Sequence, residues 1–209
     1  MADLRSELIA TARAMQPAGL NRGTSGNVSV RDGKSFWITP TGMAYEHLVE
    51  DDIPRMALDG SHIGKRKPSS EWRFHRDLYA SRPEVGAVLH AHSPFAVSLA
   101  CLRLDIPPFH YMIARFGGTT IRCAEYSIFG SESLSTAAIA AMAGRKGCLL
   151  ANHGLLVAGR DLAEALALAI ELEELCEQYW RACQLGQPVL LSAEEMAAVL
   201  EKFSGYGQQ

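Results

Sequence analysis

The chain has 209 residues, of which 48% are hydrophobic, and its 20 basic and 23 acidic residues give a formal net charge of −3. This length suits one domain over residues 1–209 with a sizeable core, and the dispersed basic residues argue against a nucleic-acid partner. No apolar stretch approaches the roughly 18 residues of a membrane span, and five cysteines without Cys-x-x-Cys spacing indicate a reducing compartment, so we expect a cytoplasmic protein that binds no membrane.

The first part of the sequence predicts a helix, a loop and a pair of strands. Apolar residues recur at helical spacing from Leu4 to Met15, which predicts an amphipathic helix that ends before Pro17. A loop rich in glycine and serine follows. Residues 27–31 and 35–39 flank Asp32-Gly33, which is the pattern of two strands joined by a hairpin turn.

The next part predicts a helix and then a strand that ends in two histidines. The helix is expected from Ser69 or Ser70 to about Arg82, and the apolar run 85–89 predicts the strand. His90 and His92 end this run, and Ser93-Pro94 offers an N-cap and a first-position proline for another helix. The two histidines therefore fall where a strand gives way to a helix, an edge that ligand sites favour.

The remaining elements are read in the same way from periodicity and turn residues. Strands are expected at 119–123, 148–150 and 155–157, and helices at 161–184 and from the Ser192/Glu195 capping box to about Phe203. The tail from about 204 to 209 is expected to be mobile. Together these elements predict a layered α/β single domain with a mixed, largely antiparallel central sheet flanked by helices.

Three histidines and one glutamate form a candidate metal site. Alternate residues of a strand point to one face, so His90 and His92 can reach the same point. Zinc takes nitrogen and oxygen ligands tetrahedrally, and a catalytic site leaves one position for water or substrate. Adding His153 from a turn and Glu71 from a helix start would complete such a site. The alternatives are that the histidine pair only packs in the core or at an edge, or that another divalent ion is bound.

Three short segments rich in glycine and small hydroxyl residues are candidates for binding a phosphate: 23–27, 39–42 and 68–70. Each alone also fits an ordinary turn or cap. Together they offer backbone N–H groups, hydroxyls and a helix N-terminus, which bind phosphate without lysine or arginine. If Ser70 caps its helix, Glu71 lies in the first turn, close to a phosphate held by the serines.

Short motifs occur in a defined order along the chain, and they are Gly23–Ser29, Ile38–Gly42, Pro68–His75, His90–His92 and Asn152–Leu155, with His110–Ala114 and Glu201–Gly207 in agreement. As a set, over nearly the whole chain, they resemble the class II aldolase/adducin-head family. The resemblance implies the fold of that family. It also implies a zinc-dependent aldolase that cleaves a ketose 1-phosphate of the L-fuculose 1-phosphate type to dihydroxyacetone phosphate and an aldehyde such as L-lactaldehyde, as in fucose catabolism.

The resemblance also implies a role for each site residue. One zinc ion per subunit would be held by Glu71, His90, His92 and His153, and Glu71 would act as acid and base once substrate arrives. The substrate phosphate would be bound by Gly26, Asn27, Thr41, Gly42, Ser69 and Ser70. Tyr111 would protonate the aldehyde oxygen across a subunit boundary and Tyr206 would help to close the site, which implies a homotetramer with active sites between subunits.

Other functions are compatible with parts of this pattern. A pentulose-phosphate 4-epimerase of the family would be expected to carry an acidic residue after the third helix, whereas 106–124 contains neither Asp nor Glu. A sugar-phosphate dehydratase could use the same ligands. A non-catalytic domain like the adducin head would be expected to lack them. His75 is expected to be a surface or packing residue.

Overall fold

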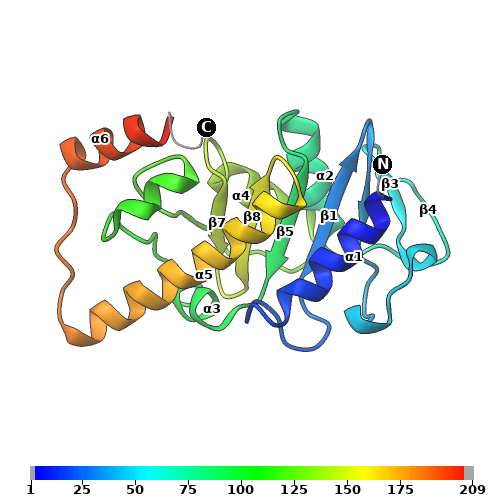
Figure 1. The fold of residues 1–209 in the computed structure, drawn as a ribbon, viewed down its shortest axis with the longest axis horizontal. Helices are drawn as coiled ribbons and strands as arrows, with labels where there is room; N and C mark the ends of the chain where they lie inside the picture. The colour runs from blue at the N-terminus through cyan, green and yellow to red at the C-terminus, as the bar shows by residue number, and fades with distance from the viewer. Residues whose placement is uncertain (1–2, 205–209) are drawn as a thin grey trace.

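An eight-stranded sheet forms the centre of the protein, whose computed structural model describes residues 3–204 (Figure 1). Its strands are β1 (Asn27–Asp32), β2 (Ser35–Ile38), β3 (Arg55–Ala57), β4 (His62–Ile63), β5 (Ala87–Ala91), β6 (Cys123–Ala124), β7 (Gly147–Leu150) and β8 (Gly154–Gly159). They lie in the order β4-β3-β2-β1-β5-β8-β7-β6, and every neighbouring pair is antiparallel except β6 and β7. The predicted mixed, largely antiparallel sheet is confirmed.

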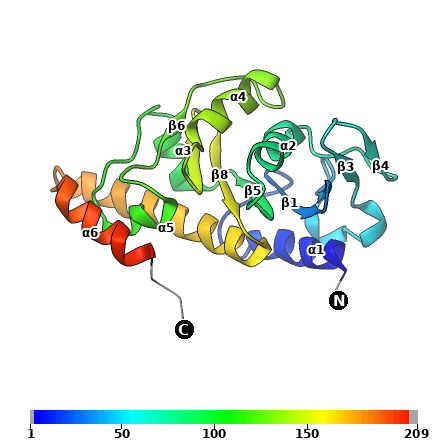
Figure 2. The same cartoon turned by 90° about the horizontal axis from the view of Figure 1, so that it is seen from above.

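Helices cover both faces of this sheet (Figure 2). The helices are α1 (Leu4–Met15), α2 (Trp72–Ser81), α3 (Pro94–Ala100), α4 (Glu132–Ala141), α5 (Leu162–Leu185) and α6 (Ala193–Ser204), with 3-10 turns η1 (Tyr45–His47), η2 (Glu50–Asp52) and η3 (Tyr111–Phe116). Helices α1, α3 and α5 share one apolar core with the sheet, whereas α2 and α4 share a second core. The layered single domain is therefore as predicted. No helix between residues 3 and 204 combines the length and hydrophobicity needed to cross a bilayer.

Strand β5 lies at the centre of the sheet, between β1 and β8, and every residue in it is buried. Its side chains alternate between the two cores, with Leu89 in the core of α1, α3 and α5 and Val88 in the core of α2 and α4. His90 faces the same side as Val88, where its ring meets the edge of Phe74 of α2 at 5.5 Å between centroids. The central strand thus aims His90 at the start of α2.

The structure differs from the sequence prediction at the start of α2, at the strand predicted at 119–123, and at β3, β4 and α4, which were not predicted from the sequence. Helix α2 begins at Trp72, so Glu71 occupies the N-cap position rather than the first turn, and the serines before it form a turn in which Ser69 Oγ accepts from the Glu71 N–H at 3.3 Å. The strand predicted at 119–123 is reduced to β6, because Ile121 pairs with Ile106 in an isolated bridge instead of joining the sheet. The very short strands β3 and β4 have no clear sequence signal.

Candidate active site

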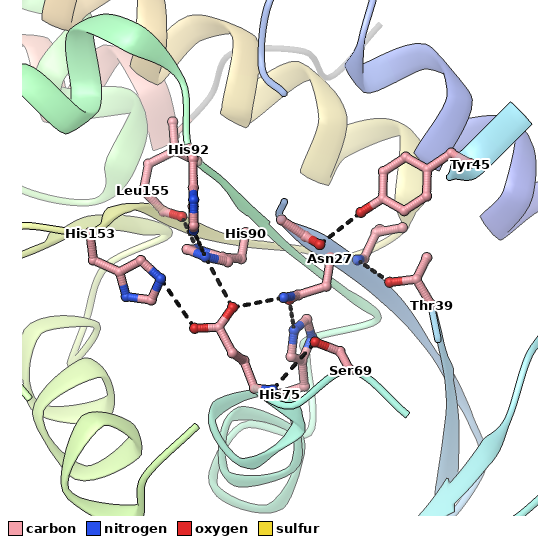
Figure 3. Close-up of polar contacts among 12 residues, drawn as sticks. Asn27, Thr39, Tyr45, Ser69, His75, His90, His92, His153 and Leu155 are labelled. Atoms are coloured by element: carbon pink, nitrogen blue, oxygen red, sulfur yellow. Dashed lines mark hydrogen bonds and ion pairs between the residues drawn. The ribbon is translucent and has the colours of Figure 1, made fainter. Parts of the chain in front are cut away.

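Glu71, His90, His92 and His153 converge from separate parts of the fold, and Figure 3 shows the three histidine rings close together. Strand β5 supplies His90 and its end supplies His92, the N-cap of α2 supplies Glu71, and the β7–β8 turn supplies His153. One ligand atom from each residue lies within 4.8 Å of all the others. The structure therefore brings together all four residues that the sequence grouped.

The turn that carries His153 is specified by the residues on either side of it. Asn152 has a φ of +54°, a left-handed conformation that asparagine tolerates better than most residues. At Gly154 a Cβ atom would collide with the carbonyl oxygen of Ala91, so only glycine lets β8 approach the end of β5 this closely. Asn-His-Gly thus places the His153 ring beside His92, with 4.8 Å between the ring centroids.

Three distances within the cluster are close to those expected around a small divalent cation. His90 Nε2 lies 2.9 Å from His92 Nε2 and 3.2 Å from Glu71 Oε2, and His153 Nε2 lies 3.1 Å from Glu71 Oε1. A tetrahedron whose ligands lie about 2.0–2.1 Å from its centre has edges of about 3.3 Å. The four side chains could therefore bind a divalent metal.

The protonation states in the cluster also suit a metal. His90 Nδ1 lies 2.8 Å from the Leu155 carbonyl oxygen and donates to it, which leaves Nε2 as the ring nitrogen that faces the cluster. Burial, and then His90 and His153, lower the pKa of His92 to about 4, so His92 is neutral at pH 7. Burial raises the pKa of Glu71, but His90 and His153 lower it by more, so the carboxyl group is ionised. The site thus offers a neutral His92 imidazole and an ionised carboxylate.

A pocket of about 180 Å³ opens beside the cluster. It is lined by all six residues predicted to bind phosphate, by the cluster residues Glu71, His92 and His153, and by Thr24, Ser25, Pro40 and Phe129. No lysine or arginine among residues 3–204 lines it. Phe129, whose side chain is exposed, adds an apolar wall to the pocket. The sequence did not reveal it, because a single phenylalanine in a loop carries no signal of a site. The predicted phosphate loops and the predicted metal ligands therefore share one pocket.

Backbone pairing holds the loops around this pocket in place. An isolated antiparallel bridge joins Pro40 to Pro68, and the Ser69 N–H donates to the Thr39 carbonyl oxygen at 3.0 Å, so loops 39–42 and 68–70 run side by side. Gly26 has a φ of +83°, and a Cβ atom there would lie 2.7 Å from the His90 carbonyl oxygen. Only glycine fits at this point, next to the end of strand β5, which carries His90.

Comparison with known proteins identifies the family. The Class II Aldolase and Adducin N-terminal domain family matches residues 6–180. The chain belongs to this family. A 5-methylthioribulose-1-phosphate/5-deoxyribulose-1-phosphate aldolase of Rhodospirillum rubrum is 53% identical over 98% of this chain and 92% of the relative. An L-fuculose phosphate aldolase of Escherichia coli strain K12 is 45% identical over 98% of this chain and 95% of the relative.

Solved structures agree with this membership. The structure of an L-fuculose 1-phosphate aldolase superposes with a TM-score of 0.93 at 40% identity, covering 98% of this chain and 97% of the other. The protein is therefore a class II aldolase, an enzyme of the aldehyde-lyase class. Class II aldolases use a divalent metal, and the cluster of Glu71 and the three histidines could hold it.

In this class II aldolase the Asn27 side chain is engaged on both sides. Asn27 is only 2% exposed, its Nδ2 donates to Glu71 Oε2 at 3.0 Å, and its Oδ1 accepts from His75 Nε2 at 2.5 Å (Figure 3). Any phosphate contact of its amide would compete with these two bonds. His75 is fully buried next to the site, and the signal for this in the sequence is its i, i+4 spacing from Glu71.

The two tyrosines predicted to take part in catalysis lie apart from the pocket or outside the described residues. Tyr111 begins η3, is 51% exposed and does not line the pocket of its own chain, so its role remains a prediction that requires a neighbouring subunit. Tyr206 lies outside the described residues, as does the tail 205–209, whereas α6 continues through Ser204.

Proposed function

We propose that this aldolase cleaves 1-phosphorylated 5-deoxypentuloses, namely 5-methylthioribulose 1-phosphate and 5-deoxyribulose 1-phosphate, between C3 and C4. One product would be dihydroxyacetone phosphate, and the other (methylthio)acetaldehyde or acetaldehyde. The observation that carries the proposal is that one pocket is lined both by the loops suited to bind a phosphate and by Glu71, His92 and His153 of the candidate metal cluster. The relative that is 53% identical supports the choice of substrate by its name.

The phosphate end of the substrate would lie against Gly26, Asn27, Thr41, Gly42, Ser69 and Ser70. Backbone N–H groups and hydroxyls bind a phosphate by hydrogen bonds alone, and this remote binding energy holds the reacting carbons in register. The distance from these loops to the cluster is short, because Ser70 and Glu71 are adjacent. The C2 and C3 oxygens would therefore reach the cluster.

A divalent cation, which we propose is one zinc ion per subunit held by Glu71, His90, His92 and His153, would supply Lewis-acid stabilisation of the negative charge that develops on the sugar oxygens. In the direction of synthesis, Glu71 takes a proton from C3 of dihydroxyacetone phosphate and leaves an electron pair between C2 and C3. That pair forms the C3–C4 bond to the aldehyde, whose oxygen takes a proton from Tyr111 of a neighbouring subunit. Cleavage is the reverse of these steps.

Phe129 supports an apolar aldehyde product. Its exposed ring lines the same pocket as His92 and Glu71, and a methyl or methylthio group needs no hydrogen-bond partner against it. The hydroxyl of L-lactaldehyde would need such a partner. L-Fuculose 1-phosphate, and with it a role in fucose catabolism, is the second candidate, supported by the structural neighbour with a TM-score of 0.93.

Assembly and location belong to the same proposal. A homotetramer with active sites between subunits would bring Tyr111, exposed on η3, to the pocket of a neighbour, and Tyr206 would help to close it. A cytoplasmic location is supported by the five cysteines, Cys101, Cys123, Cys148, Cys176 and Cys183, which all carry free thiols.

The deciding experiment incubates the metal-loaded enzyme with these three ketose 1-phosphates and identifies the released aldehydes by mass spectrometry. We expect the highest kcat/KM for the two 5-deoxypentulose phosphates. A preference for L-fuculose 1-phosphate would favour the second candidate. An isomeric ketose phosphate as product would indicate an epimerase and loss of water a dehydratase, and either result would reject aldol cleavage.

A further inference from the structure

A continuous chain of buried polar side chains lies behind Glu71, between the sheet and α2. Asn27 bonds to Glu71 and to His75 as described above, His75 Nδ1 lies 2.7 Å from Ser29 Oγ, and Ser29 Oγ lies 2.7 Å from Tyr79 Oη. None of these four residues is more than 2% exposed. Burying a polar group costs free energy unless it is hydrogen-bonded, and here each side chain bonds to the next, so the connected side chains hold one another in place.

The charge on Glu71 determines the direction of every hydrogen bond in this chain. An ionised carboxylate only accepts, so Asn27 must present its N–H to Glu71 and its Oδ1 to His75. His75 then carries its proton on Nε2, and its Nδ1 must accept from the Ser29 hydroxyl. The Ser29 oxygen in turn accepts from the Tyr79 hydroxyl. Every donor in this series of hydrogen bonds therefore faces an acceptor.

The protonation states of His75 and Tyr79 agree with this direction. Burial, followed by the charge of His90, lowers the pKa of His75 to about 3, so the ring is neutral at pH 7. Burial also raises the pKa of Tyr79 well above its usual value, so the phenol keeps its proton and remains a donor. The opposite direction would turn Asn27 Oδ1 towards Glu71 Oε2, placing two oxygens against each other at 3.0 Å.

We propose that His75 is a positioning residue for Glu71. Supported by Ser29 and Tyr79, His75 holds the Asn27 amide in the orientation that anchors Glu71 Oε2. Glu71 Oε1 is then the oxygen that exchanges the proton at C3. Glu71 Oε2 accepts from Asn27 and lies 3.2 Å from His90 Nε2, whereas the buried Oε1 makes no bond to Asn27 and lies 3.1 Å from His153 Nε2, a candidate metal ligand. The inference rests on the proposed role of Glu71 as acid and base. His75 itself does not line the pocket.

Two substitutions of His75 separate positioning from packing. In His75→Gln the amide nitrogen takes the place of ring Nε2 and still donates to Asn27, whereas the shorter His75→Asn places its amide near Nδ1 and loses that donor. We expect His75→Asn to lower kcat about 10- to 100-fold, with KM and metal content within about twofold of the wild type. His75→Gln should restore most of kcat. Equal losses of kcat in the two variants, tracking their thermal stability, would overturn the proposal.

A spectroscopic measurement tests the direction of the chain without any turnover. The 15N NMR spectrum of the metal-free protein should show His75 protonated at Nε2 and unprotonated at Nδ1, with His75→Gln used to assign the signals. Ser29→Ala should shift this tautomer equilibrium and Tyr79→Phe should do so less. The matched control is Ser135→Ala, which removes an equally buried hydroxyl that donates to Asp77 and is not part of the chain.

The outcomes distinguish this inference from the proposed function. A proton on Nδ1 of His75 in an active wild-type aldolase would reject the inference alone. Absence of cleavage for every ketose 1-phosphate would reject the proposed function, and with it the proposed catalytic role of the hydrogen-bonded side chains behind Glu71. Unchanged kcat in His75→Asn would leave the function standing and reject the positioning role.

Discussion

The hydroxyl of Ser93 donates a 2.6 Å hydrogen bond to Glu173, which lies 80 residues further along the chain on α5. Glu173 also accepts from the backbone N–H groups of Phe95 and Ala96, both at 2.8 Å. Ser93 does stand at the N-cap of α3, as its sequence predicts, but its side chain makes no cap bond, and the capping carboxylate comes from α5. Because Ser93 follows His92 directly, α5 also fixes the backbone next to a candidate metal ligand.

Replacing Glu173 by alanine is expected to destabilise the protein. The change leaves two N–H groups at the start of α3 without their acceptor, which costs about 1–3 kcal/mol in the free energy of unfolding. Urea unfolding followed by circular dichroism measures it. The exposed neighbour Glu174→Ala is the control and should change stability by less than about 0.5 kcal/mol. Equal effects of the two changes would contradict the capping role.

Replacing His92 by alanine is expected to abolish metal binding and activity together. The wild type should hold about one divalent metal per chain, and loss of a direct ligand should weaken the affinity by more than the roughly 10- to 100-fold typical of an outer partner. Elemental analysis after dialysis measures the metal content. His47→Ala, an exposed histidine on η1, is the control. A metal-free wild type that still cleaves substrate would reject the metal site.

Replacing Glu71 by glutamine is expected to separate binding from catalysis. The three histidines remain, so the variant should retain substantial metal, whereas an amide cannot exchange the proton at C3. We expect kcat to fall about 100- to 10,000-fold. Single-turnover kinetics and metal analysis on the same sample measure both. Undiminished turnover would remove the acid–base role of Glu71.

Acid should destabilise the metal-free protein through His75. The pKa of His75 is about 3 in the folded protein and about 6.5 in the unfolded chain, so between these values only the unfolded chain binds the proton. The free energy of unfolding should therefore fall as the pH falls below about 6.5, by up to about 1.4 kcal/mol per pH unit. Urea unfolding from pH 7 to pH 4 measures this slope. In His75→Gln this slope should be smaller by the same amount. If the free energies of unfolding of the wild type and of His75→Gln changed in parallel with pH, His75 would not be the source of the acid sensitivity.

The sequence by itself determined many of the elements and the four residues of the candidate metal cluster. Helix α1 and the β1–β2 hairpin follow from apolar spacing and turn residues that act over a few positions. The ordered motifs were also sufficient to group Glu71, His90, His92 and His153, because strand alternation and turn chemistry limit where such side chains can point.

Only the tertiary structure decided how these groups are held. Strand β5 pairs with β1 so that Asn27 lies opposite His90, which brings the Asn27 amide to a carboxylate 44 residues away and to the buried His75. Likewise, the packing of α5 against α3 supplies Glu173 to a helix start that Ser93 was expected to cap by itself. Such contacts depend on strand order and on burial in two separate cores, which are set by the whole chain rather than by neighbouring residues.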